Sequence, residues 1–345
     1  MQSILVTGAA GFIGFHVARR LLADGGAVIA LDNLNSYYDP KLKKARLAEL
    51  AAYPNFHFQQ HDVADRNAIA ELFVAHRFDA VIHLAAQAGV RYSLLDPHAY
   101  ADANLTGFLN ILEGCRHTGC KHLIYASSSS VYGANTRMPL RAADNTDHPL
   151  SLYGSTKKAN EVMAHAYASL FGLPATGLRF FTVYGPWGRP DMAMWQFTAA
   201  IMDGMPVKLF NNGRMGRDFT YIDDVTEAVI RLVGHPPDPN PAWSRDAPDP
   251  ATSYAPWRLY NIGNSSPVEV IELVRLIERA VGRPAIREFL PMQPGDVLET
   301  FADSSDLERV VGFRPNTRIE DGTRLFVEWF RAYRRSEGMK EAPRS

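Results

Sequence analysis

The pair Tyr153 and Lys157, four residues apart in the segment 152–157, carries the clearest chemistry in this chain. On a helix this spacing puts the phenol and the ammonium on one face. A tyrosine has an ordinary pKa of about 10 and accepts protons poorly at neutral pH, but a nearby cation favours its phenolate. We therefore expect Tyr153 to act as a base that takes a proton from a hydroxyl while a hydride leaves the same carbon. A solvated pair without function is the alternative, and the rest of the chain must decide between the two.

A glycine-rich turn near the start of the chain is the second chemical feature. The apolar run 4–6 leads into Gly8, Gly11 and Gly14 and then into a helix-like stretch at 15–23. Glycines at this spacing allow a tight turn and a close approach of the backbone to a pyrophosphate, which then lies at the positive end of the helix. The pattern predicts a strand, a turn and a helix that bind a dinucleotide.

Asp32 indicates which dinucleotide this is. It ends a second apolar run, 27–31, where its carboxylate can accept hydrogen bonds from the hydroxyls of the adenosine ribose. The same carboxylate would repel a 2′-phosphate. We therefore expect NAD rather than NADP.

Short apolar runs alternate with helical patterns through the first half of the chain, which predicts a Rossmann-type, doubly wound α/β fold with a parallel sheet. The expected strands lie near 3–7, 27–32, 55–60, 79–84, 122–127 and 174–179. After Tyr184 the alternation breaks. Later segments look like a helix at 218–233 and a strand at 259–263 that return to the first domain, and like two further helices at 268–281 and 321–333.

These patterns predict a smaller, discontinuous C-terminal substrate domain. We expect the NAD-binding domain to comprise 1–183, 218–235 and 259–263, and the substrate domain to comprise 184–217 and 264–335. Between 236 and 258 we expect a Pro-rich surface loop, because the stretch 236–256 holds seven prolines and no periodic pattern.

Composition limits the class of protein. The chain has 345 residues, 46% of them hydrophobic, and a net charge of −1, which suits one large or two smaller globular domains. We expect no nucleic-acid partner, and we expect the basic stretch 41–44 to be a solvated helix face. The chain has no apolar span of 18 residues, and Met1 lies close to the first strand, so we expect a cytoplasmic protein without a signal peptide or membrane anchor. Cys115 and Cys120 should be reduced thiols, and no metal-ligand spacing is present.

The chain resembles the extended short-chain dehydrogenase/reductase family from Met1 to about residue 330. Four features carry the resemblance and occur in the family's order: the glycine turn, the strand end 81–86, the strand 123–126 with the serine run 127–130, and Tyr153 with Lys157. The resemblance implies that NAD is the cofactor. It also implies that NAD is contacted by Gly8, Gly11, Phe12, Ile13, Gly14, Asp32, Asn33, Asp62, Val63, Leu84, Ala85, Ala86, Gln87, Asn104, Tyr153, Lys157 and Phe181.

The serine run narrows the reaction. The family places a hydroxyl three residues before a valine, here Val131, which makes Ser128 the partner of Tyr153, with Ser127, Ser129 and Ser130 as alternatives. At positions 129 and 130 the family's dehydratases carry Asp-Glu and its decarboxylases carry Ser-Glu. A hydroxyl cannot replace a general acid or base, so two serines there argue against both reactions. Oxidation followed by reduction at one carbon remains, which is epimerisation through a 4-keto sugar.

Substrate identity depends on three segments, 88–93, 179–193 and 291–296, which resemble those of the UDP-glucuronate 4-epimerases within the family. Thr182 stands where UDP-glucose 4-epimerases carry asparagine, and Gln293 stands where they carry arginine. Arg189 gives a physical reason for an acidic sugar, because a guanidinium can bind a carboxylate through two parallel hydrogen bonds. A surface position for Arg189 is the alternative. The expected UDP-sugar contacts are Arg91, Ser128, Thr182, Arg189, Arg217, Gln293 and Asp296.

Particular roles follow from the same resemblance. Arg217 would clamp the diphosphate, Asp296 would contact the nucleotide ribose, and Arg214 would face solvent. Arg91 could contact either the acidic group or phosphate. The family's relatives dimerise through two helices, here near 100–116 and 153–171, so we expect a homodimer, although the same apolar residues could face the chain's own sheet. A UDP-glucose-type epimerase, a decarboxylase and a non-catalytic NAD-binding protein remain the alternative functions.

Overall fold

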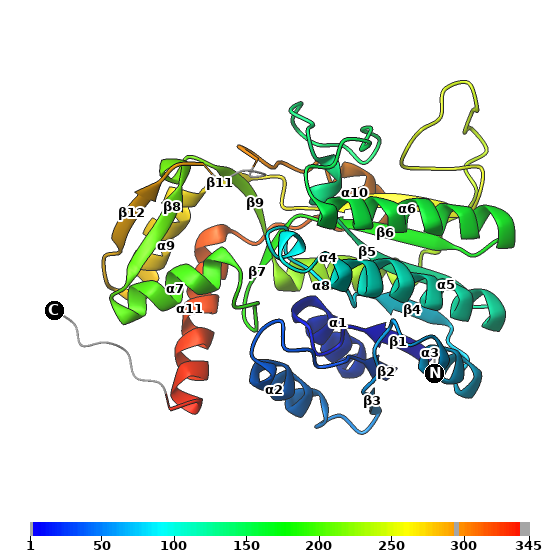
Figure 1. Cartoon of the computed structure of the whole chain (residues 1–345), viewed down its shortest axis with the longest axis horizontal. Helices are drawn as coiled ribbons and strands as arrows, with labels where there is room; N and C mark the ends of the chain where they lie inside the picture. Colours follow the sequence, from blue (N-terminus) through cyan, green and yellow to red (C-terminus); the bar gives the residue numbers. More distant parts are fainter. Residues whose placement is uncertain (1–2, 293–296, 339–345) are drawn as a thin grey trace.

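The computed structural model describes residues 3–292 and 297–338, and a seven-stranded parallel sheet forms its larger part (Figure 1). The strand order is β10-β6-β5-β4-β1-β2-β3. The strands are β1 Ser3–Thr7, β2 Ala27–Leu31, β3 Phe56–Gln59, β4 Ala80–His83, β5 His122–Ser128, β6 Ala175–Phe180 and β10 Trp257–Ile262. All six strands expected in the first half are confirmed, and so is the later return near 259–263.

Helices cover both faces of this sheet, as the alternation predicted. Because neighbouring residues of a strand point to opposite faces, Ile4 and Val6 of β1 belong to one apolar core while Leu5 between them belongs to the other. On the first face α1 packs against α8 and α2, and on the second α5 packs against α3 and α6. These helices are α1 Phe12–Ala23, α2 Pro40–Leu50, α3 Arg66–Ala75, α5 Gly107–Thr118, α6 Leu152–Phe171 and α8 Ile222–Val233.

The strand order reverses direction at β1, which pairs with β2 on one side and with β4 on the other. In open parallel sheets, ligands bind in the crevice outside the carboxyl ends of the strands at such a point. The ends of β1, β2 and β4 therefore mark the place where the expected site should lie.

A smaller part, at the left of Figure 1, is built around two small sheets and three helices. One sheet has the order β11-β9-β7 and the other pairs β12 with β8. These elements are β7 Thr182–Tyr184, α7 Ala193–Asp203, β8 Pro206–Phe210, β9 Gly216–Tyr221, β11 Pro267–Glu269, α9 Val270–Val281, β12 Ile286–Leu290 and α11 Ile319–Ser336. The two remaining α-helices of the described residues are short, α4 Pro97–Tyr100 and α10 Ser305–Val311.

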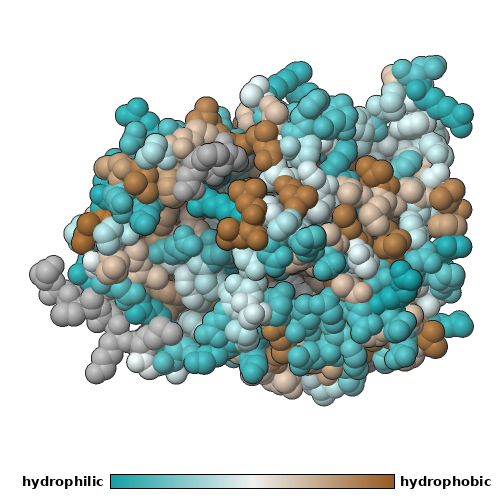
Figure 2. Space-filling model, in the orientation of Figure 1, coloured by the Kyte–Doolittle hydropathy of each residue, from teal (hydrophilic) through white to brown (hydrophobic). Residues whose placement is uncertain are grey.

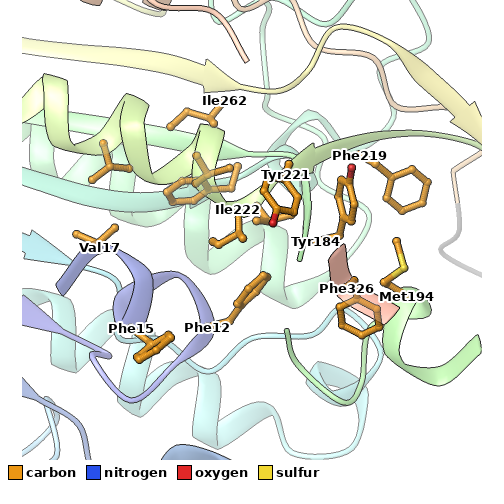
Figure 3. Packing of buried hydrophobic residues seen from close by; sticks show 14 of the residues in the cluster. Phe12, Phe15, Val17, Tyr184, Met194, Phe219, Tyr221, Ile222, Ile262 and Phe326 are labelled. Atoms are coloured by element: carbon orange, nitrogen blue, oxygen red, sulfur yellow. The ribbon is translucent and has the colours of Figure 1, made fainter. Parts of the chain in front are cut away.

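Both parts share one apolar core. Phe12 and Phe15 of α1 lie in the same cluster as Ile222 of α8, Tyr184 of β7 and Phe326 of α11 (Figure 3). This packing fixes the glycine turn at the start of α1 relative to the smaller part.

Two expected helices begin later than the sequence pattern predicted. The segment 218–221 belongs to β9, so the helix expected at 218–233 starts at Ile222. Likewise 267–269 pairs with β9 as β11, so the helix expected at 268–281 starts at Val270. In both cases strand pairing with a distant segment prevails over the local helical spacing, while the helix expected at 321–333 lies within α11.

The Pro-rich segment is in part anchored to the larger part. Its first residues project from the body at the upper right of Figure 1 without forming a helix or strand. Its last residues, in contrast, include the buried side chains Ala251, Thr252, Ser253 and Ala255. Ser253 Oγ lies 2.8 Å from His165 Nε2 on α6, so this end packs against the helix instead of forming surface loop throughout.

The described surface is mixed in character. Hydrophobic residues gather near the centre and right of the face in Figure 2, in the region where Figure 1 shows α4, α5 and α6. Between residues 94 and 171, the large exposed apolar side chains include Leu94, Leu95, Val162, Leu170 and Phe171. Among the helices of residues 3–292 and 297–338, none combines the length and the hydrophobicity that crossing a membrane requires.

Candidate active site

The glycine turn between β1 and α1 is too tight for side chains. Gly8 has a φ of +70°, and a Cβ on it would lie 2.7 Å from the amide nitrogen of Ala85. A Cβ on Gly14 would collide with the carbonyl oxygen of Gly8. The turn is held by the Gly8 amide, which donates to the Leu31 carbonyl at 2.7 Å. Glycine is therefore required here by the contacts that the turn makes with the backbone around it.

The start of α1 presents open amides to this turn. Gly11 is the N-cap residue and has no side chain with which to cap the helix. The next two residues, Phe12 and Ile13, line the cavity described below. Helix N-termini of this kind bind the pyrophosphate of a dinucleotide. Both observations fit the expected dinucleotide.

Asp32 lies just beyond β2 and is 6% exposed. Its Oδ1 accepts a hydrogen bond from the Leu34 amide at 2.8 Å and lies 3.7 Å from Lys43 Nζ. Lys43 itself is buried, which corrects the expectation that the stretch 41–44 is a solvated face. The physical reason is that α2 turns Lys43 toward the end of β2, where Asn35 Oδ1 accepts from its ammonium at 2.9 Å. The carboxylate fits the role expected for the adenosine ribose.

A single cavity of about 1040 Å³ runs from the glycine turn into the smaller part. Pockets for one drug-sized ligand measure about 300–1,000 Å³, so this cavity lies just above that range and suits more than one ligand. Most residues expected to contact NAD line it: Gly8, Gly11, Phe12, Ile13, Gly14, Asp32, Asn33, Val63, Leu84, Ala85, Ala86, Gln87, Tyr153, Lys157 and Phe181.

Asp62 and Asn104 are not among the residues that line the cavity, and each is hydrogen-bonded to a residue that does. Asp62 Oδ2 accepts from the side-chain amide of Asn33 at 2.8 Å. Asn104 is buried in a π-helical turn, Ala101–Thr106, where its Oδ1 accepts from the Gln87 amide at 2.8 Å and its Nδ2 donates to the Gln87 carbonyl at 3.0 Å. Such turns often mark functional sites. Both side chains hold residues that line the cavity.

Tyr153 and Lys157 lie in the first turns of α6, whose N-cap Ser151 accepts from the Gly154 amide at 3.0 Å. Both line the cavity. Lys157 is 3% exposed, and its ammonium donates to the Ala126 carbonyl at 2.9 Å. Burial lowers the pKa of Lys157 to about 8.

Arg189 is a cation that favours the Tyr153 phenolate and that the sequence spacing did not indicate. Burial raises the pKa of Tyr153, whereas the Ser128 hydroxyl and the charge of Arg189 lower it, and the charge of Asp191 raises it. The Lys157 ammonium donates to the Ala126 carbonyl at 2.9 Å, and its effect on Tyr153 stays a prediction.

The four serines of the run differ in their surroundings. Ser127 Oγ donates to Glu161 Oε1 at 2.6 Å, and Glu161 forms a buried ion pair with Arg179 at 2.8 Å. Ser127 is therefore engaged in a structural network. Ser128 Oγ donates to Ser130 Oγ and accepts from the Ser130 amide, both at 3.2 Å, and the Ser128 hydroxyl lowers the pKa of Tyr153. This difference supports Ser128 over Ser127 as the partner of the tyrosine.

Arg189 lines the cavity, so it is not a surface loop arginine. Its guanidinium donates from Nε to Asp191 Oδ1 at 2.9 Å and from Nη2 to Asp191 Oδ2 at 2.5 Å. Tyr37 donates to the same carboxylate at 3.1 Å. Thr182, at the start of β7, lines the same cavity.

The remaining expected substrate contacts lie farther into the smaller part. Arg217 and Arg91 line the cavity; Arg217 Nη1 donates to the Gly216 carbonyl at 2.8 Å, and Arg91 lies 5.0 Å from the centre of the Phe210 ring. Arg214 is exposed, as expected. Gln293 and Asp296 lie outside the described residues.

Sequence reasoning missed three residues of this region: Tyr37, Asp191 and Arg46. Arg46 is fully buried, and its guanidinium donates to the Ala10 carbonyl at 2.8 Å and to the Trp187 carbonyl at 2.6 Å. It thus joins the glycine turn to the loop that carries Arg189. The proximity of Asp191 to Arg189 in the chain was a signal that could have been used, whereas Arg46 gives no local signal.

A doubly wound sheet with a glycine turn at its switch point, and Ser128, Tyr153 and Lys157 in the same cavity, define a dinucleotide-binding α/β protein with a candidate catalytic site. The chain belongs to the NAD dependent epimerase/dehydratase family, whose model matches residues 4–243.

The chain is also similar to named members of this family. The chain is 49% identical to the probable UDP-glucuronate 4-epimerase of Rhizobium meliloti over 337 residues, covering 96% of this chain and 98% of the relative. Among solved structures it is similar to UDP-glucuronic acid 4-epimerase from Bacillus cereus in complex with UDP-glucuronic acid and NAD, with a TM-score of 0.84, 30% identity and coverage of 96% and 100%. It is also similar to UDP-glucose 4-epimerase with UDP-glucose from Thermotoga maritima, with a TM-score of 0.83, 30% identity and coverage of 96% and 99%.

Proposed function

We propose that this protein interconverts UDP-glucuronate and UDP-galacturonate by NAD-dependent epimerisation at C4. One observation carries the proposal: the Ser128–Tyr153 pair and the guanidinium of Arg189 line a single cavity that begins at the glycine turn. The first supplies proton transfer at a hydroxyl, and the second supplies a positive charge for an acidic sugar. The named relatives from Rhizobium meliloti and Bacillus cereus support the same assignment.

The larger part of the chain would hold NAD. The open amides of Phe12 and Ile13 would bind its pyrophosphate, Asp32 its adenosine ribose, and Tyr153 and Lys157 the region of the nicotinamide. When bound there, NAD supplies a hydride acceptor that takes the hydrogen from C4 and later returns it.

The chain's own residues would move the proton and hold the sugar. Tyr153 takes the proton of the 4-hydroxyl and gives it back to the oxygen of the 4-keto sugar, while Ser128 donates a hydrogen bond to that oxygen. Arg189 favours the tyrosine's charged form. Between the two transfers the planar 4-keto sugar turns over, so that its other face meets the hydride, while Arg217 retains the diphosphate.

A 4-keto uronate is a β-keto acid, which loses CO2 when the bond to its carboxylate lies parallel to the carbonyl π system. An epimerase must prevent that alignment. Thr182 and Arg189, which line the cavity together, would hold the carboxylate near the plane of the ring. Ser129 and Ser130 offer no acid or base that would assist elimination or decarboxylation.

A UDP-glucose-type 4-epimerase is the second candidate, favoured by the equally similar structure from Thermotoga maritima. The two candidates predict different substrates. Incubation of the protein with UDP-glucuronate, UDP-glucose and UDP-xylose in separate reactions, followed by NMR, distinguishes them. We expect a new UDP-galacturonate signal from the first reaction. UDP-galactose as the sole product would favour the second candidate. UDP-xylose formed from UDP-glucuronate would indicate a decarboxylase, and no turnover of any of the three sugars would indicate a non-catalytic protein.

The homodimer expected from the sequence is part of this proposal. It is supported by the exposed apolar side chains Val162, Leu170 and Phe171, which lie on α6, one of the two helices expected at the interface. Sedimentation of the purified chain tests it. The domain division at 183/184, with returns at 218–235 and 259–263, and the cytoplasmic location also stay predictions.

A further inference from the structure

The side chains of Tyr37, Asp191 and Arg189 form a cluster at the sugar end of the cavity, and all three line it. A guanidinium has five N–H groups in a rigid fork. Asp191 accepts one hydrogen bond from Nε and one from Nη2 of Arg189, so it holds the fork along a single edge. The edge that carries Nη1 is not used by Asp191.

Tyr37 fixes the carboxylate from the other side. Its hydroxyl donates to Asp191 Oδ2 at 3.1 Å, and burial together with the Asp191 charge raises the pKa of Tyr37 to about 12, so the hydroxyl keeps its proton at neutral pH. The hydroxyl approaches the backbone at Gly89 closely, and a Cβ there would lie 2.5 Å from it. Tyr37 also packs on Tyr92, with ring centres 4.9 Å apart. The position of Asp191 is therefore set by a packed aromatic side chain.

We propose that Asp191, held by Tyr37, is a positioning residue that fixes the Arg189 guanidinium so that the acidic group of the sugar is bound at one angle. This inference rests on the proposed function. It assigns to two residues outside the expected set the task of setting carboxylate geometry, on which the choice between epimerisation and loss of CO2 depends.

The argument for positioning follows from geometry. A guanidinium bound along one edge cannot turn, either within its plane or out of it, without breaking two charge-assisted hydrogen bonds. A guanidinium without that partner can follow the sugar's carboxylate through several orientations, including the one parallel to the carbonyl π system. Arg189 would still attract the sugar's carboxylate, but it would no longer hold that carboxylate in one orientation.

Charge leads to a second consequence. Asp191 offsets the positive charge of Arg189 in this part of the cavity. Without it the anionic sugar should bind at least as tightly as before. Loss of orientation combined with unchanged or tighter binding lowers kcat without raising KM.

The test compares Asp191→Asn and Tyr37→Phe with the parent chain. The matched controls are Asp306→Asn, which removes an exposed acid paired with Arg309, and Tyr254→Phe, which removes a half-exposed hydroxyl bonded to Ser169. For each protein we would measure kcat and KM for UDP-glucuronate, the fraction of pentose product, and the dissociation constants of UDP and UDP-glucuronate by calorimetry. An unchanged UDP constant shows that the fold and the nucleotide site are intact.

For Asp191→Asn we expect about a tenfold fall in kcat, an unchanged or lower KM, and a pentose product absent from the parent, because hydrogen bonds to charged groups contribute at this scale. For Tyr37→Phe we expect about a threefold fall in kcat. If Tyr37 acts through Asp191, the double variant should lose less than the two single losses combined.

The pH profile adds a readout that a merely structural role would not change. Tyr153 is influenced by Arg189, Asp191 and Tyr100, and Lys157 lies one turn along its helix. Removing the negative charge of Asp191 leaves the Arg189 charge uncompensated, so the acid limb of kcat should move to lower pH.

Failure of this inference differs from failure of the proposed function. If the parent epimerises UDP-glucuronate and Asp191→Asn keeps its kcat and forms no pentose, the positioning role is wrong and the function stands. If the parent turns over no UDP-glucuronate, the function is wrong, and calorimetry then decides on the inference. UDP-glucuronate binding that weakens relative to UDP in Asp191→Asn would overturn it, whereas unchanged or tighter binding would support it.

Discussion

The two walls of the cavity are built in different ways. The wall toward the dinucleotide consists of backbone: glycines in a turn, amides at the start of α1, and strand ends that carry few large side chains. The wall toward the sugar consists of long charged side chains, among them Arg189 and Arg217, which extend from loops and short strands. The first recognises a ligand shared by many enzymes, whereas the second determines which sugar enters.

This contrast predicts different sensitivities to substitution. A backbone wall should tolerate no added atoms where segments approach closely, because nothing can move aside. A side-chain wall should keep its shape when one side chain is changed, but it should lose orientation or charge. Substitutions on each wall should therefore fail in different measurements.

The largest effect is expected for Gly14→Ala in the backbone wall. The added Cβ would collide with the Gly8 carbonyl oxygen, so the turn must open. We expect loss of bound NAD and of all turnover, and a lower free energy of unfolding by about 3 kcal/mol, as for overpacked cores. Gly234→Ala is the matched control, since its Cβ would approach only the Arg231 carbonyl oxygen, at 3.9 Å. NAD content after purification and denaturation midpoints give the answer, and a Gly14→Ala protein that retains NAD would contradict the rigidity of this wall.

Tyr153→Phe should be next in size, because it removes the proton acceptor where the two walls meet. We expect kcat to fall by about 10²–10⁴-fold, the range for general acid–base groups, with little change in UDP binding. Tyr167→Phe serves as a control, since Tyr167 donates to Glu113 away from the cavity. Steady-state rates and calorimetry measure both quantities. Retention of a tenth of the parent rate would exclude Tyr153 as the base.

Arg189→Ala should change the side-chain wall without disturbing NAD. Loss of a charged hydrogen-bonding group costs about 1.5–3 kcal/mol, which corresponds to roughly 10–150-fold in rate. We expect either a pentose product formed with CO2 or lost activity toward UDP-glucuronate, while bound NAD stays at the parent level. Arg214→Ala, an exposed change in the same part of the chain, should have no effect. Unchanged kinetics without CO2 release would show that Arg189 does not hold the carboxylate.

The last prediction concerns the pH dependence of stability and involves His83 of β4 and His122 of β5, both in the larger part of the fold. Burial lowers the pKa of His83 to about 3 and that of His122 to about 4, from 6.5. Between these values and 6.5 the unfolded chain binds more protons than the folded one. The contribution of these buried neutral histidines to the free energy of unfolding is therefore fully present above about pH 6.5. It falls as the pH drops toward 4, by about 2 kcal/mol per histidine between pH 7 and pH 5.

Urea midpoints at pH 7 and pH 5 check this expectation. His122→Gln should reduce the difference between them, whereas replacing His57, which is exposed, should not. Equal midpoints at the two pH values in the parent would mean that these histidines are protonated in the fold.

Sequence reasoning was most successful where chemistry depends on local spacing. The glycines, Asp32 and the strand ends were predictable because each lies within a few residues of the element that positions it, and the cavity brings them together. The serine run could be placed but not resolved, since only the buried Glu161 distinguishes Ser127 from Ser128.

Where positions depend on contacts between distant segments, the sequence was insufficient. Arg46 is buried by contacts with Ala10 and Trp187, which are 36 and 141 positions away. Tyr37 meets Asp191 across 154 positions. The effect of Lys157 on Tyr153 stays a prediction: both residues lie on α6 as the spacing indicated, and the ammonium donates to the Ala126 carbonyl.

Transfer of hydrogen away from C4 and back to the same carbon is the central claim, and an isotope experiment tests it most directly. The purified protein, without added nicotinamide, is incubated with UDP-glucuronate that carries deuterium at C4, and the product is analysed by NMR. We predict UDP-galacturonate that retains the deuterium at C4. Product in which that deuterium has been replaced by hydrogen from water, or the absence of UDP-galacturonate, would contradict the account.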